Sequence, residues 1–441
     1  MRVRSTSKNS INVDSIILAM IIAKDPIEAK RMIISKILEG FKCNSRFGVD
    51  IRTEPSFIVV EKPDYIGNSE LEYDICGEMY LARFKPYAEK AAKKLLEKPY
   101  TRRISIPIWR PKDHLCHTPA AITEISYIVD ESLHLTAYLR SLECMNYFEL
   151  NFDFLYYALE KVADVSGFDV GSLALVVGIP HIYERDAKRA NEESEDYKET
   201  YGYTELGTHL IEDYISSAWH SALEVIYNNG KRKRTEWGEF FEGQQESLFV
   251  HRLFIEVKNP EENKIHDKAP FTEKYGIEYA HDYVIHAASI DKPVTKPILK
   301  EGEEYTYAER ARYCEKDKVK VDQLYECIKK LDDTCRRDCY VGISRLYDID
   351  SSDPPCLRGY QFVLLRNALG GVFYMRSNDV YGAMHANMFA FALLTKYIAE
   401  MKRFEKYRYY HFALDAHIYT QFLDDVRDIL YPETPKYSDF I

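Results

Sequence analysis

Hydrophobic and polar positions follow two periods along this chain, and both periods recur in each half. Segments 25–41 and 214–230 space their apolar residues as amphipathic helices do. Segments 152–167 and 388–404 predict a second pair of helices, and each is followed by a strand that ends in His-Ile-Tyr. Because helical and strand-like stretches alternate in both halves, the pattern favours a mixed α+β fold.

The polar positions inside this pattern also repeat. The stretch YLRSLECMNYFELN at 138–151 matches YMRSNDVYGAMHAN at 374–387, with Arg-Ser, an acid three residues after the arginine and an asparagine eleven residues after it. In both halves a histidine follows that asparagine by 30 residues. A repeated order of this kind indicates an internal duplication. We predict two tandem units, 1–195 and 215–441, joined by a charged connector at 196–214.

The ordered polar residues of the second half resemble those of the thymidylate synthase family, nearest to its compact archaeal-type members. The matching series is Arg336-Arg337, Pro355-Cys356, Arg376-Ser377-Asn378-Asp379, Asn387 and His417-Ile418-Tyr419, with Tyr307 in an upstream tyrosine–arginine segment. The resemblance implies an α+β fold of two thymidylate-synthase-like units, each a mixed sheet with packed helices. It also implies that the two units form a dimer-like pair within one chain, a pseudo-dimer.

The resemblance gives Cys356 a covalent role. A thiolate that adds to C6 of a uracil ring makes C5 nucleophilic, which is nucleophilic catalysis. A lone cysteine at the start of a strand is more often a small buried hydrophobic residue. The regular spacing from Cys356 to Arg376, Asn387 and His417 favours the catalytic interpretation.

Substrate contacts are implied in the same way. Arg376 and Ser377 would bind a phosphate, since a guanidinium fork and a hydroxyl both donate to its oxygens. Asn387 would pair with O4 and N3 of the pyrimidine. His417 and Tyr419 would hydrogen-bond the 3′-hydroxyl of the deoxyribose. Each of these residues also has an ordinary structural alternative, as a surface ion pair, a turn, a helix cap or a core side chain.

Three further roles complete the expected chemistry. Asp379 would hold the pterin of the one-carbon donor, or else cap a helix. Tyr307 would act among the catalytic residues. A glutamate is needed as general acid or base near O4, and Glu278 is our choice, ahead of Glu273 and Asp282.

Several positions match or depart from the family at the edges of the site. Arg46 in the first half and Arg234 in the second correspond to an N-terminal phosphate-loop arginine, and Ile441 to an apolar C-terminal residue that closes the site. Leu357 stands where many members have histidine, and Met375 where glutamine is common. These departures concern closure over the one-carbon donor.

The first half keeps most of the set but lacks the thiol. Counting 20 residues back from Arg140, as from Arg376 to Cys356, reaches Ala120 in HTPAAITEIS. The other retained residues are Ser141, Asn151, His181 and Tyr183. We therefore predict a pseudo-site without a nucleophile around Ala120.

Double arginines stand at matching places in both halves. In thymidylate synthase dimers the double arginine of each subunit reaches the phosphate site of its partner. The resemblance therefore implies that Arg102 and Arg103 complete the Cys356 site, while Arg336 and Arg337 complete the pseudo-site.

Composition narrows the remaining function classes. With 59 basic and 70 acidic residues, the net charge of −11 lacks the footprint of a duplex nucleic-acid binder. No apolar run is long enough to predict a membrane span, and segment 12–26 is predicted as a helix rather than a signal peptide. Nine cysteines without CxxC pairs predict a reduced, cytoplasmic protein with no metal site.

The function that these observations predict is C5 methylation of dUMP through a covalent cysteine adduct. The co-substrate would be methylenetetrahydrofolate or methylenetetrahydromethanopterin, and a monomeric pseudo-dimer is the expected assembly. Two alternatives stay open: a dUMP or dCMP hydroxymethylase of the same superfamily, and a non-catalytic nucleotide-binding regulatory protein.

Overall fold

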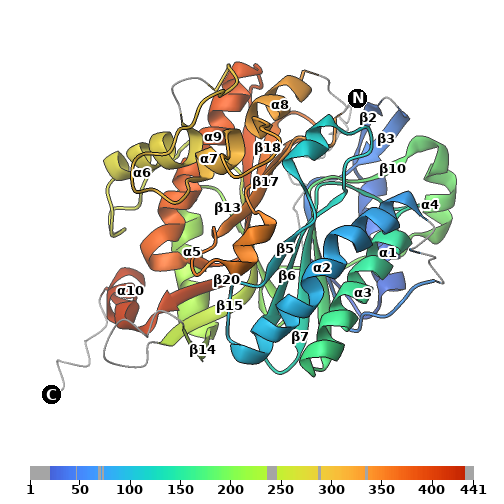
Figure 1. Cartoon of the computed structure of the whole chain (residues 1–441), viewed down its shortest axis with the longest axis horizontal. Helices are drawn as coiled ribbons and strands as arrows, with labels where there is room; N and C mark the ends of the chain where they lie inside the picture. The colour runs from blue at the N-terminus through green and yellow to red at the C-terminus, as the bar shows by residue number, and fades with distance from the viewer. Residues whose placement is uncertain are drawn as a thin grey trace, which may run out of the picture.

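The structure is a computed structural model that describes residues 20–432, apart from 46, 68–70, 72–73, 236–245, 287–289 and 333–335. Arg46 and Ile441, both named above, therefore lie outside the described residues. Figure 1 shows the first half of the chain, in blue to green, beside the second half, in yellow to red. Strands of both halves meet in the middle, and helices cover the outer sides.

A seven-stranded sheet forms the base of the first half, and a four-stranded sheet lies beside it. The larger sheet has the order β11 (Glu199–Thr200), β1 (Met20–Ala23), β4 (Ser56–Val60), β9 (Val170–Val177), β7 (Leu133–Leu139), β6 (Ile122–Val129) and β5 (Ser105–Pro107). The smaller one has the order β2 (Phe41–Ser45), β3 (Gly48–Arg52), β10 (Pro180–Tyr183) and β8 (Leu142–Glu143). The central strands are apolar nearly throughout because both of their faces are covered.

The second half is built on one larger sheet. Its order is β12 (Gly202–Thr204), β13 (Gly207–Glu212), β15 (Glu246–Val257), β20 (Tyr407–Tyr419), β18 (Leu369–Met375), β17 (Leu357–Leu364) and β16 (Tyr340–Gly342), while β14 (Lys231–Arg234) pairs with β15 and β19 (Asn378–Asp379) with β20. The order β1-β4-β9-β7-β6-β5 of the first half repeats as β13-β15-β20-β18-β17-β16. The alternation of parallel and antiparallel pairs is also the same.

The long strands β15 and β20 each replace two strands of the first half. β3 and β4 are separated at Pro55, which lacks the N–H that a continuous strand needs. β15 instead passes the corresponding point through Arg252, whose φ of 57° is left-handed. Two units of one topology in one chain confirm the predicted fold class, an α+β arrangement of tandem units.

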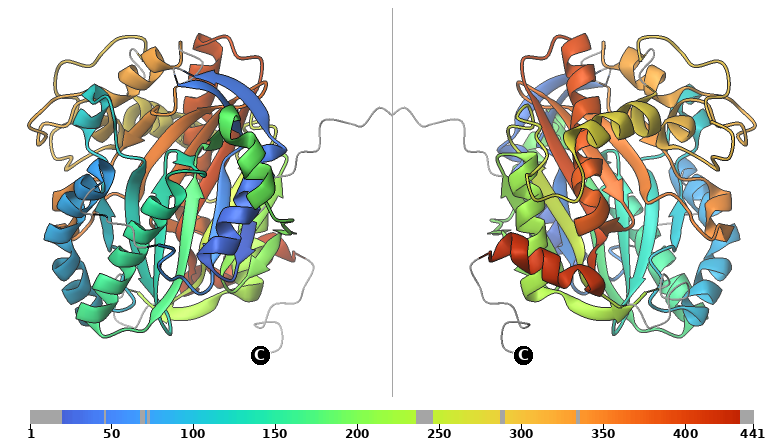
Figure 2. Two further views of the ribbon diagram at one scale, coloured as in Figure 1. Left: turned by 90° about the vertical axis from the view of Figure 1, so that its right-hand side faces the viewer. Right: turned by 90° about the vertical axis from the view of Figure 1, so that its left-hand side faces the viewer.

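Helices pack on the outer face of each sheet. Those of the first half are α1 (Pro26–Leu38), α2 (Ile75–Glu97), α3 (Phe148–Ser166) and α4 (Ala187–Glu193). Those of the second half are α5 (Ile215–Asn229), α6 (Glu273–Tyr279), α7 (Tyr307–Arg312), α8 (Gln323–Lys330), α9 (His385–Met401) and α10 (Leu423–Leu430). The two side views of Figure 2 show α1 to α3 on one outer side and α9 and α10 on the other. Each sheet therefore has one face left for the other unit.

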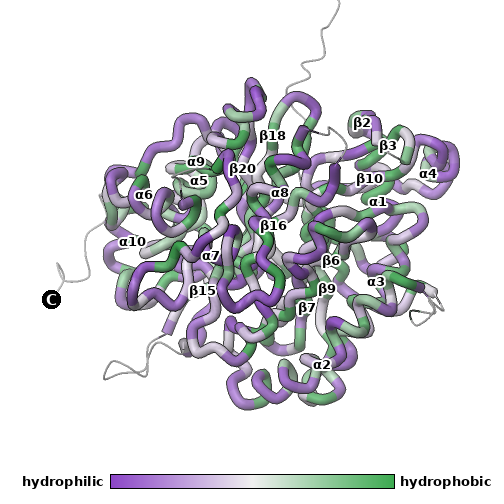
Figure 3. The backbone as a smooth tube through the Cα atoms, turned by 45° about the horizontal axis from the view of Figure 1, so that its top comes forward, coloured by the Kyte–Doolittle hydropathy of each residue, from purple (hydrophilic) through white to green (hydrophobic). Residues whose placement is uncertain are grey.

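Aromatic side chains fill the space between the two sheets. Phe57 packs against Phe254 and Phe412, with ring centroids 6.0 and 5.4 Å apart, and Tyr138 stacks on Tyr340 at 5.6 Å. Figure 3 shows hydrophobic stretches gathered along the central strands and hydrophilic stretches on the peripheral loops. The aromatic part of the joint between the units is therefore packed like the core of a domain.

The structure describes the predicted connector at 196–214 and part of the helix predicted over 12–26. Residues 196–214 contain β11, which pairs with β1, as well as β12 and β13 of the other sheet, so this segment supplies strands to both units. The unit boundaries themselves stay a prediction. The helix predicted over 12–26 is wrong where it is described, because Met20–Ala23 forms β1. No helix among the described residues is both long and apolar enough to cross a membrane.

Candidate active site

A cavity of about 580 Å³ opens beside the start of β17 and contains most of the predicted site. The predicted residues that line it are Arg102, Arg103, Tyr307, Cys356, Arg376, Ser377, Asp379, Asn387, His417 and Tyr419. They come from both halves of the chain, and two of them, Arg102 and Tyr419, are 317 positions apart in the sequence. We call this cavity the Cys356 pocket.

The corner that carries Cys356 is held by a buried arginine. Pro354 and Pro355 lead into Cys356, which is half-buried and directly precedes β17. Arg376 donates through Nε to the carbonyl of Pro355 at 3.1 Å and through Nη2 to that of Pro354 at 2.5 Å, while its backbone N–H donates to the Cys356 carbonyl at 2.9 Å. Proline removes backbone N–H groups here, so side-chain donors fix the corner in their place.

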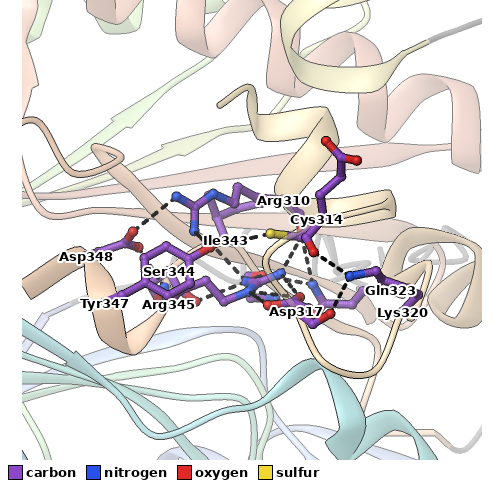
Figure 4. Close-up of polar contacts among 12 residues, drawn as sticks. Arg310, Cys314, Asp317, Lys320, Gln323, Ile343, Ser344, Arg345, Tyr347 and Asp348 are labelled. Atoms are coloured by element: carbon purple, nitrogen blue, oxygen red, sulfur yellow. Dashed lines mark hydrogen bonds and ion pairs between the residues drawn. The ribbon is translucent and has the colours of Figure 1, made fainter. Parts of the chain in front are cut away.

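A second arginine network anchors the segment that leads to this corner (Figure 4). The buried Arg345 guanidinium makes an ion pair with Asp317 at 2.8 Å and donates to the carbonyls of Gly342, Ile343 and Ser344. The short 3₁₀ helix Leu346–Asp350 begins directly after Arg345. Because every donor is satisfied internally, this network serves to hold the loop in place.

Arg102 reaches the Cys356 pocket from the first half. Its Nη2 donates to the Tyr419 hydroxyl at 3.3 Å, its Nη1 lies 3.6 Å from Asp415, and its carbonyl accepts from Arg376 Nη1 at 2.9 Å. Burial acts to lower the pKa of Arg102, but Asp415 and Tyr419 outweigh it and raise the pKa. The guanidinium therefore stays charged inside the pocket.

His417 and Asp415 form a buried pair on β20. His417 Nδ1 lies 3.0 Å from Asp415 Oδ1, and Lys233 also makes an ion pair with Asp415. Burial lowers the pKa of His417, and nearby Arg102 lowers it further, so the ring is neutral at physiological pH. A neutral ring whose Nδ1–H faces the carboxylate presents Nε2 as an acceptor. Among the described residues, Nε2 has no hydrogen-bond partner.

The amide of Asn387 is oriented by two neighbours. Its Oδ1 accepts from the Tyr279 hydroxyl at 2.8 Å, and its Nδ2 donates to Asn378 Oδ1 at 3.3 Å. Burial raises the pKa of Tyr279 well above its ordinary value, so this phenol remains a donor. One N–H and one lone pair of Asn387 stay available on the amide.

Not every predicted residue reaches the pocket. Glu278 does not line it; its side chain is 63% exposed and lies 3.8 Å from Lys274 on α6, so its position does not support the predicted acid–base role. Arg234 does not line it either, and its guanidinium lies 6.0 Å from the ring of Tyr100, which does. Asp379 lines the pocket and also accepts the N–H of Gly382 at 3.0 Å, the cap expected of an aspartate there.

Three tyrosines dominate the side of the pocket where a glutamate was expected. Tyr279, Tyr283 and Tyr307 line it, and the rings of Tyr283 and Tyr307 lie 4.9 Å apart. The Tyr307 hydroxyl accepts the N–H of Leu357 at 3.3 Å. The lining carboxylates of the described chain are Asp353 and Asp379. Sequence reasoning missed Tyr279 and Tyr283, although their four-residue spacing indicates one face of a helix.

The first half contains a matching cavity of about 700 Å³, which we call the Ala121 pocket. The predicted pseudo-site residues that line it are Arg140, Ser141, Asn151, His181, Tyr183, Arg336 and Arg337. Ala120 is buried and does not line it. The residue in the place of Cys356 is Ala121, because the Ala121 carbonyl accepts the backbone N–H of Arg140 at 2.9 Å.

The one-residue difference between Ala120 and Ala121 has a local cause in the hairpin that follows. Residues 130–132 connect β6 to β7, whereas 365–368 connect β17 to β18, so the first hairpin is one residue shorter. The prediction that Ala120 replaces the nucleophile was therefore wrong by one position.

The double arginines are offset by one residue in the same way. The Arg337 carbonyl accepts from Arg140 Nη1 at 2.9 Å, as the Arg102 carbonyl accepts from Arg376, and Arg337 Nη2 donates to the Tyr183 hydroxyl at 3.2 Å. Arg337 therefore corresponds to Arg102. Asp338 takes the place of Arg103, and Arg336 makes an ion pair with Asp338 at 2.7 Å.

The described residues contain no group of three or more His, Cys, Asp or Glu side chains suited to a metal ion. Beside the carboxylates of Asp353 and Asp379, the Cys356 pocket contains guanidinium and amide donors, which suit an organic anion. Three arginines from the two halves, a buried histidine, an oriented amide and a half-buried thiol thus converge on one cavity.

Comparison with known proteins gives a consistent result. The family model described as thymidylate synthase matches residues 87–214 and 274–439. A protein of Methanococcoides burtonii named "Putative thymidylate synthase" is 27% identical over 49% of this chain and 91% of its own length. A Methanopyrus kandleri protein of the same name is 28% identical over 48% and 93%, respectively.

Among solved structures, the thermostable thymidylate synthase A from Bacillus subtilis covers 49% of this chain and 84% of its own, with 18% identity and a TM-score of 0.37. The family model matches more than half of the chain, and its two matched segments fall in the two halves that repeat one topology. The chain belongs to the thymidylate synthase family.

Proposed function

We propose that this chain methylates C5 of dUMP at the Cys356 pocket. The observation that carries the proposal is the position of a half-buried thiol in a cavity that also contains Arg102, Arg376 and the oriented amide of Asn387. This chemistry requires a nucleophile, a site for the anion and a side chain that hydrogen-bonds the edge of the pyrimidine.

The phosphate would be bound by residues from both halves. Arg376 and Ser377 lie at the Cys356 corner, and Arg102 and Arg103 enter from the first half. Arg376 makes no ion pair with a carboxylate in the described chain, and its guanidinium donates to the carbonyl oxygens of Pro354, Pro355 and Arg102. A buried guanidinium without a counter-ion favours a bound anion.

The sugar and the base would be recognised by neutral groups. Nε2 of His417 accepts from a 3′-hydroxyl, and Tyr419 lies beside it with ring centroids 5.0 Å apart. Asn387 donates from Nδ2 to O4 of uracil and accepts at Oδ1 from its N3–H. Cytosine lacks that N3–H and carries a donor at C4, so the orientation set by Tyr279 favours uracil.

In the covalent step, the Cys356 sulfur forms a bond to C6, and the electron pair of the C5–C6 double bond moves toward C5 and O4. C5 then forms a bond to the transferred carbon and loses its hydrogen as a proton, and the bond from that carbon to the donor breaks. The bond from sulfur to C6 breaks in the elimination, and addition of a hydride to the transferred carbon completes the methyl group. A reduced-pterin methylene donor, methylenetetrahydrofolate or methylenetetrahydromethanopterin, supplies the carbon and the hydride when bound. Asp379, at the rim of the pocket, would contact it.

The test is release of tritium from 5-tritiated dUMP in the presence of either donor. We expect release from the native chain and none from Cys356→Ala. A product heavier by CH₂ identifies methylation, and one heavier by CH₂O identifies hydroxymethylation, the alternative within the superfamily. Equal release from Cys356→Ala contradicts the proposal.

One observation favours a second candidate, a non-catalytic nucleotide-binding protein. No glutamate lines the Cys356 pocket in the described chain, and tyrosines occupy that side. A pocket without an acid–base carboxylate near O4 can bind dUMP without turning it over. Tight dUMP binding without tritium release from either donor would identify this function.

A further inference from the structure

The Ala121 pocket contains a buried arginine, Arg140, near Asp338, whose ion pairs in the described chain are with Arg336 and Lys330. Arg140 is 8% exposed, and its guanidinium donates to the carbonyls of Pro119, Ala120 and Arg337 at 2.7, 2.7 and 2.9 Å. Within the described chain, no carboxylate forms an ion pair with it. Burial lowers the pKa of Arg140, which reflects the cost of a cation kept from water. An anion bound in the pocket would offset that cost.

Two more arginines surround this position. Arg337, from the second half, lies 5.7 Å from the centre of the Tyr183 ring and donates to its hydroxyl, while the Arg185 guanidinium lies over the same ring at 4.5 Å. Arg185 lines the Ala121 pocket, whereas Gln421 lines the Cys356 pocket two residues after Tyr419. The Ala121 pocket thus gains a cation at this position, while Asp338 stands where the Cys356 pocket has Arg103.

The Ala121 pocket also keeps neutral residues that match His417 and Asn387 of the Cys356 pocket. His181 is buried and lines it, and burial, helped by Arg337, lowers the pKa of its ring well below the ordinary value, so the ring is neutral. Asn151 Oδ1 accepts from the Tyr80 hydroxyl at 3.1 Å, as Asn387 Oδ1 does from Tyr279. The aromatic ring of Tyr147 lines the same cavity. Anion, hydroxyl and planar-ring subsites therefore follow one another in the same order as around Cys356.

We propose that the Ala121 pocket is a second nucleotide site, which binds a pyrimidine nucleoside monophosphate without reacting with it. Arg140, Ser141 and Arg337 bind the phosphate, Arg185 closes over it, and His181 and Tyr183 bind the sugar. With Ala121 in place of a thiol, no bond to the ring can form. The ligand class rests on the function proposed for the Cys356 pocket, whereas the anion site rests on Arg140 itself.

The experiment counts dUMP bound per chain by equilibrium dialysis, without a one-carbon donor. We expect two equivalents for the native chain and one for Ala121→Phe, which places a ring inside the pocket. Arg185→Gln, which copies the Cys356 pocket at an exposed position, should weaken one of the two sites about tenfold and leave the other unchanged. Cys356→Phe is the matched control and should also leave one equivalent.

The outcomes separate this proposal from the proposed function. One equivalent in the native chain, or two equivalents in Ala121→Phe, overturns the second site. Inorganic phosphate that displaces dUMP from the Ala121 pocket at equal concentration also overturns it, because the sugar and base then add nothing. If Ala121→Phe binds one equivalent fewer and the native chain releases no tritium, the second site is supported and the methyltransferase is contradicted. Far-UV circular dichroism of each variant confirms that the chain is folded.

Discussion

Ala121 and Cys356 occupy the same structural position in the two halves of this chain. In each case the carbonyl accepts the backbone N–H of the arginine that holds the corner, at 2.9 Å, and the side chain lines a cavity. The units therefore differ at the atom on which covalent chemistry depends. Cys356→Ser should abolish tritium release, because a hydroxyl is a far weaker nucleophile than a thiolate at neutral pH. The matched variant Ala121→Ser should leave the rate within about twofold.

Arg102 allows a test of whether one half completes the pocket of the other. Arg102→Ala should weaken dUMP binding at the Cys356 pocket by about 1.5–3 kcal/mol, roughly 10- to 150-fold in Kd, since a charge-assisted contact is lost. Arg102→Ala combined with Arg103→Ala should abolish binding there. Affinity is measured by calorimetry in the Ala121→Phe background, which leaves only this pocket. The control is Arg337→Ala, which removes the equivalent arginine of the other pocket, and an unchanged Kd for Arg102→Ala would contradict the assignment.

Glu124 and Arg358 make a buried ion pair at 2.9 Å that joins β6 of the first half to β17 of the second. Arg358 also donates from Nη1 to the Pro355 carbonyl behind Cys356, at 3.2 Å. Glu124→Gln leaves the arginine charge uncompensated and should lower the free energy of unfolding by about 3–5 kcal/mol. Urea denaturation followed by tryptophan fluorescence measures this change.

The double variant Glu124→Leu with Arg358→Met separates stability from positioning. Replacing both charges with apolar side chains should recover most of the free energy of unfolding. The Pro355 carbonyl keeps Arg376 Nε as a donor but loses Arg358 Nη1, so kcat should remain reduced. Full recovery of kcat together with stability would show that the pair has no positioning role.

Tyr279 provides a test of base recognition. Tyr279→Phe removes the donor to Asn387 Oδ1 and frees the amide to rotate, so discrimination between dUMP and dCMP should fall by about 1 kcal/mol, roughly fivefold. Competition of each nucleotide for the Cys356 pocket measures the ratio. Tyr283→Phe, on the same face of the helix, is the control. An unchanged ratio in Tyr279→Phe would contradict the role given to this hydroxyl.

Stability should fall in acid because of buried histidines. Burial, together with nearby Lys36, lowers the pKa of His209 from 6.5 to about 3, and both ring nitrogens lack partners in the described chain. Between these values the unfolded chain binds a proton that the folded chain does not, so stability is lost as the pH falls below 6.5. At pH 5 the loss is about 2 kcal/mol from this residue.

His209→Phe should remove that contribution and retain the ring contact with Phe254, whose centroid lies 5.3 Å away. The free energy of unfolding, measured at pH 7 and pH 5, should therefore change less in the variant than in the native chain. An equal change in both would show that His209 takes up no proton on unfolding.

The sequence by itself determined the duplication, the family and most of the Cys356 pocket. Asn387 and His417 stand on α9 and β20, and Arg376 directly follows β18; their spacing, with the family resemblance, was enough to predict that they converge. The place of the proposed nucleophile was predicted for the same reason, since a proline pair and a strand start define its corner locally. These features depend on short-range chain geometry, which a sequence states directly.

Only the tertiary structure decided the rest. One residue fewer in the hairpin after β6 moves the position of the missing thiol from Ala120 to Ala121, and a count along the chain cannot detect a loop shortened by one. Glu278, chosen for the acid–base role, lies exposed outside the pocket lining, because residue type does not reveal which face of a short helix turns outward. The pairing of Arg102 with Tyr419 joins groups 317 residues apart, and that proximity arises from the packing of two sheets. Long-range packing energy sets such contacts, and it has no local signature in the sequence.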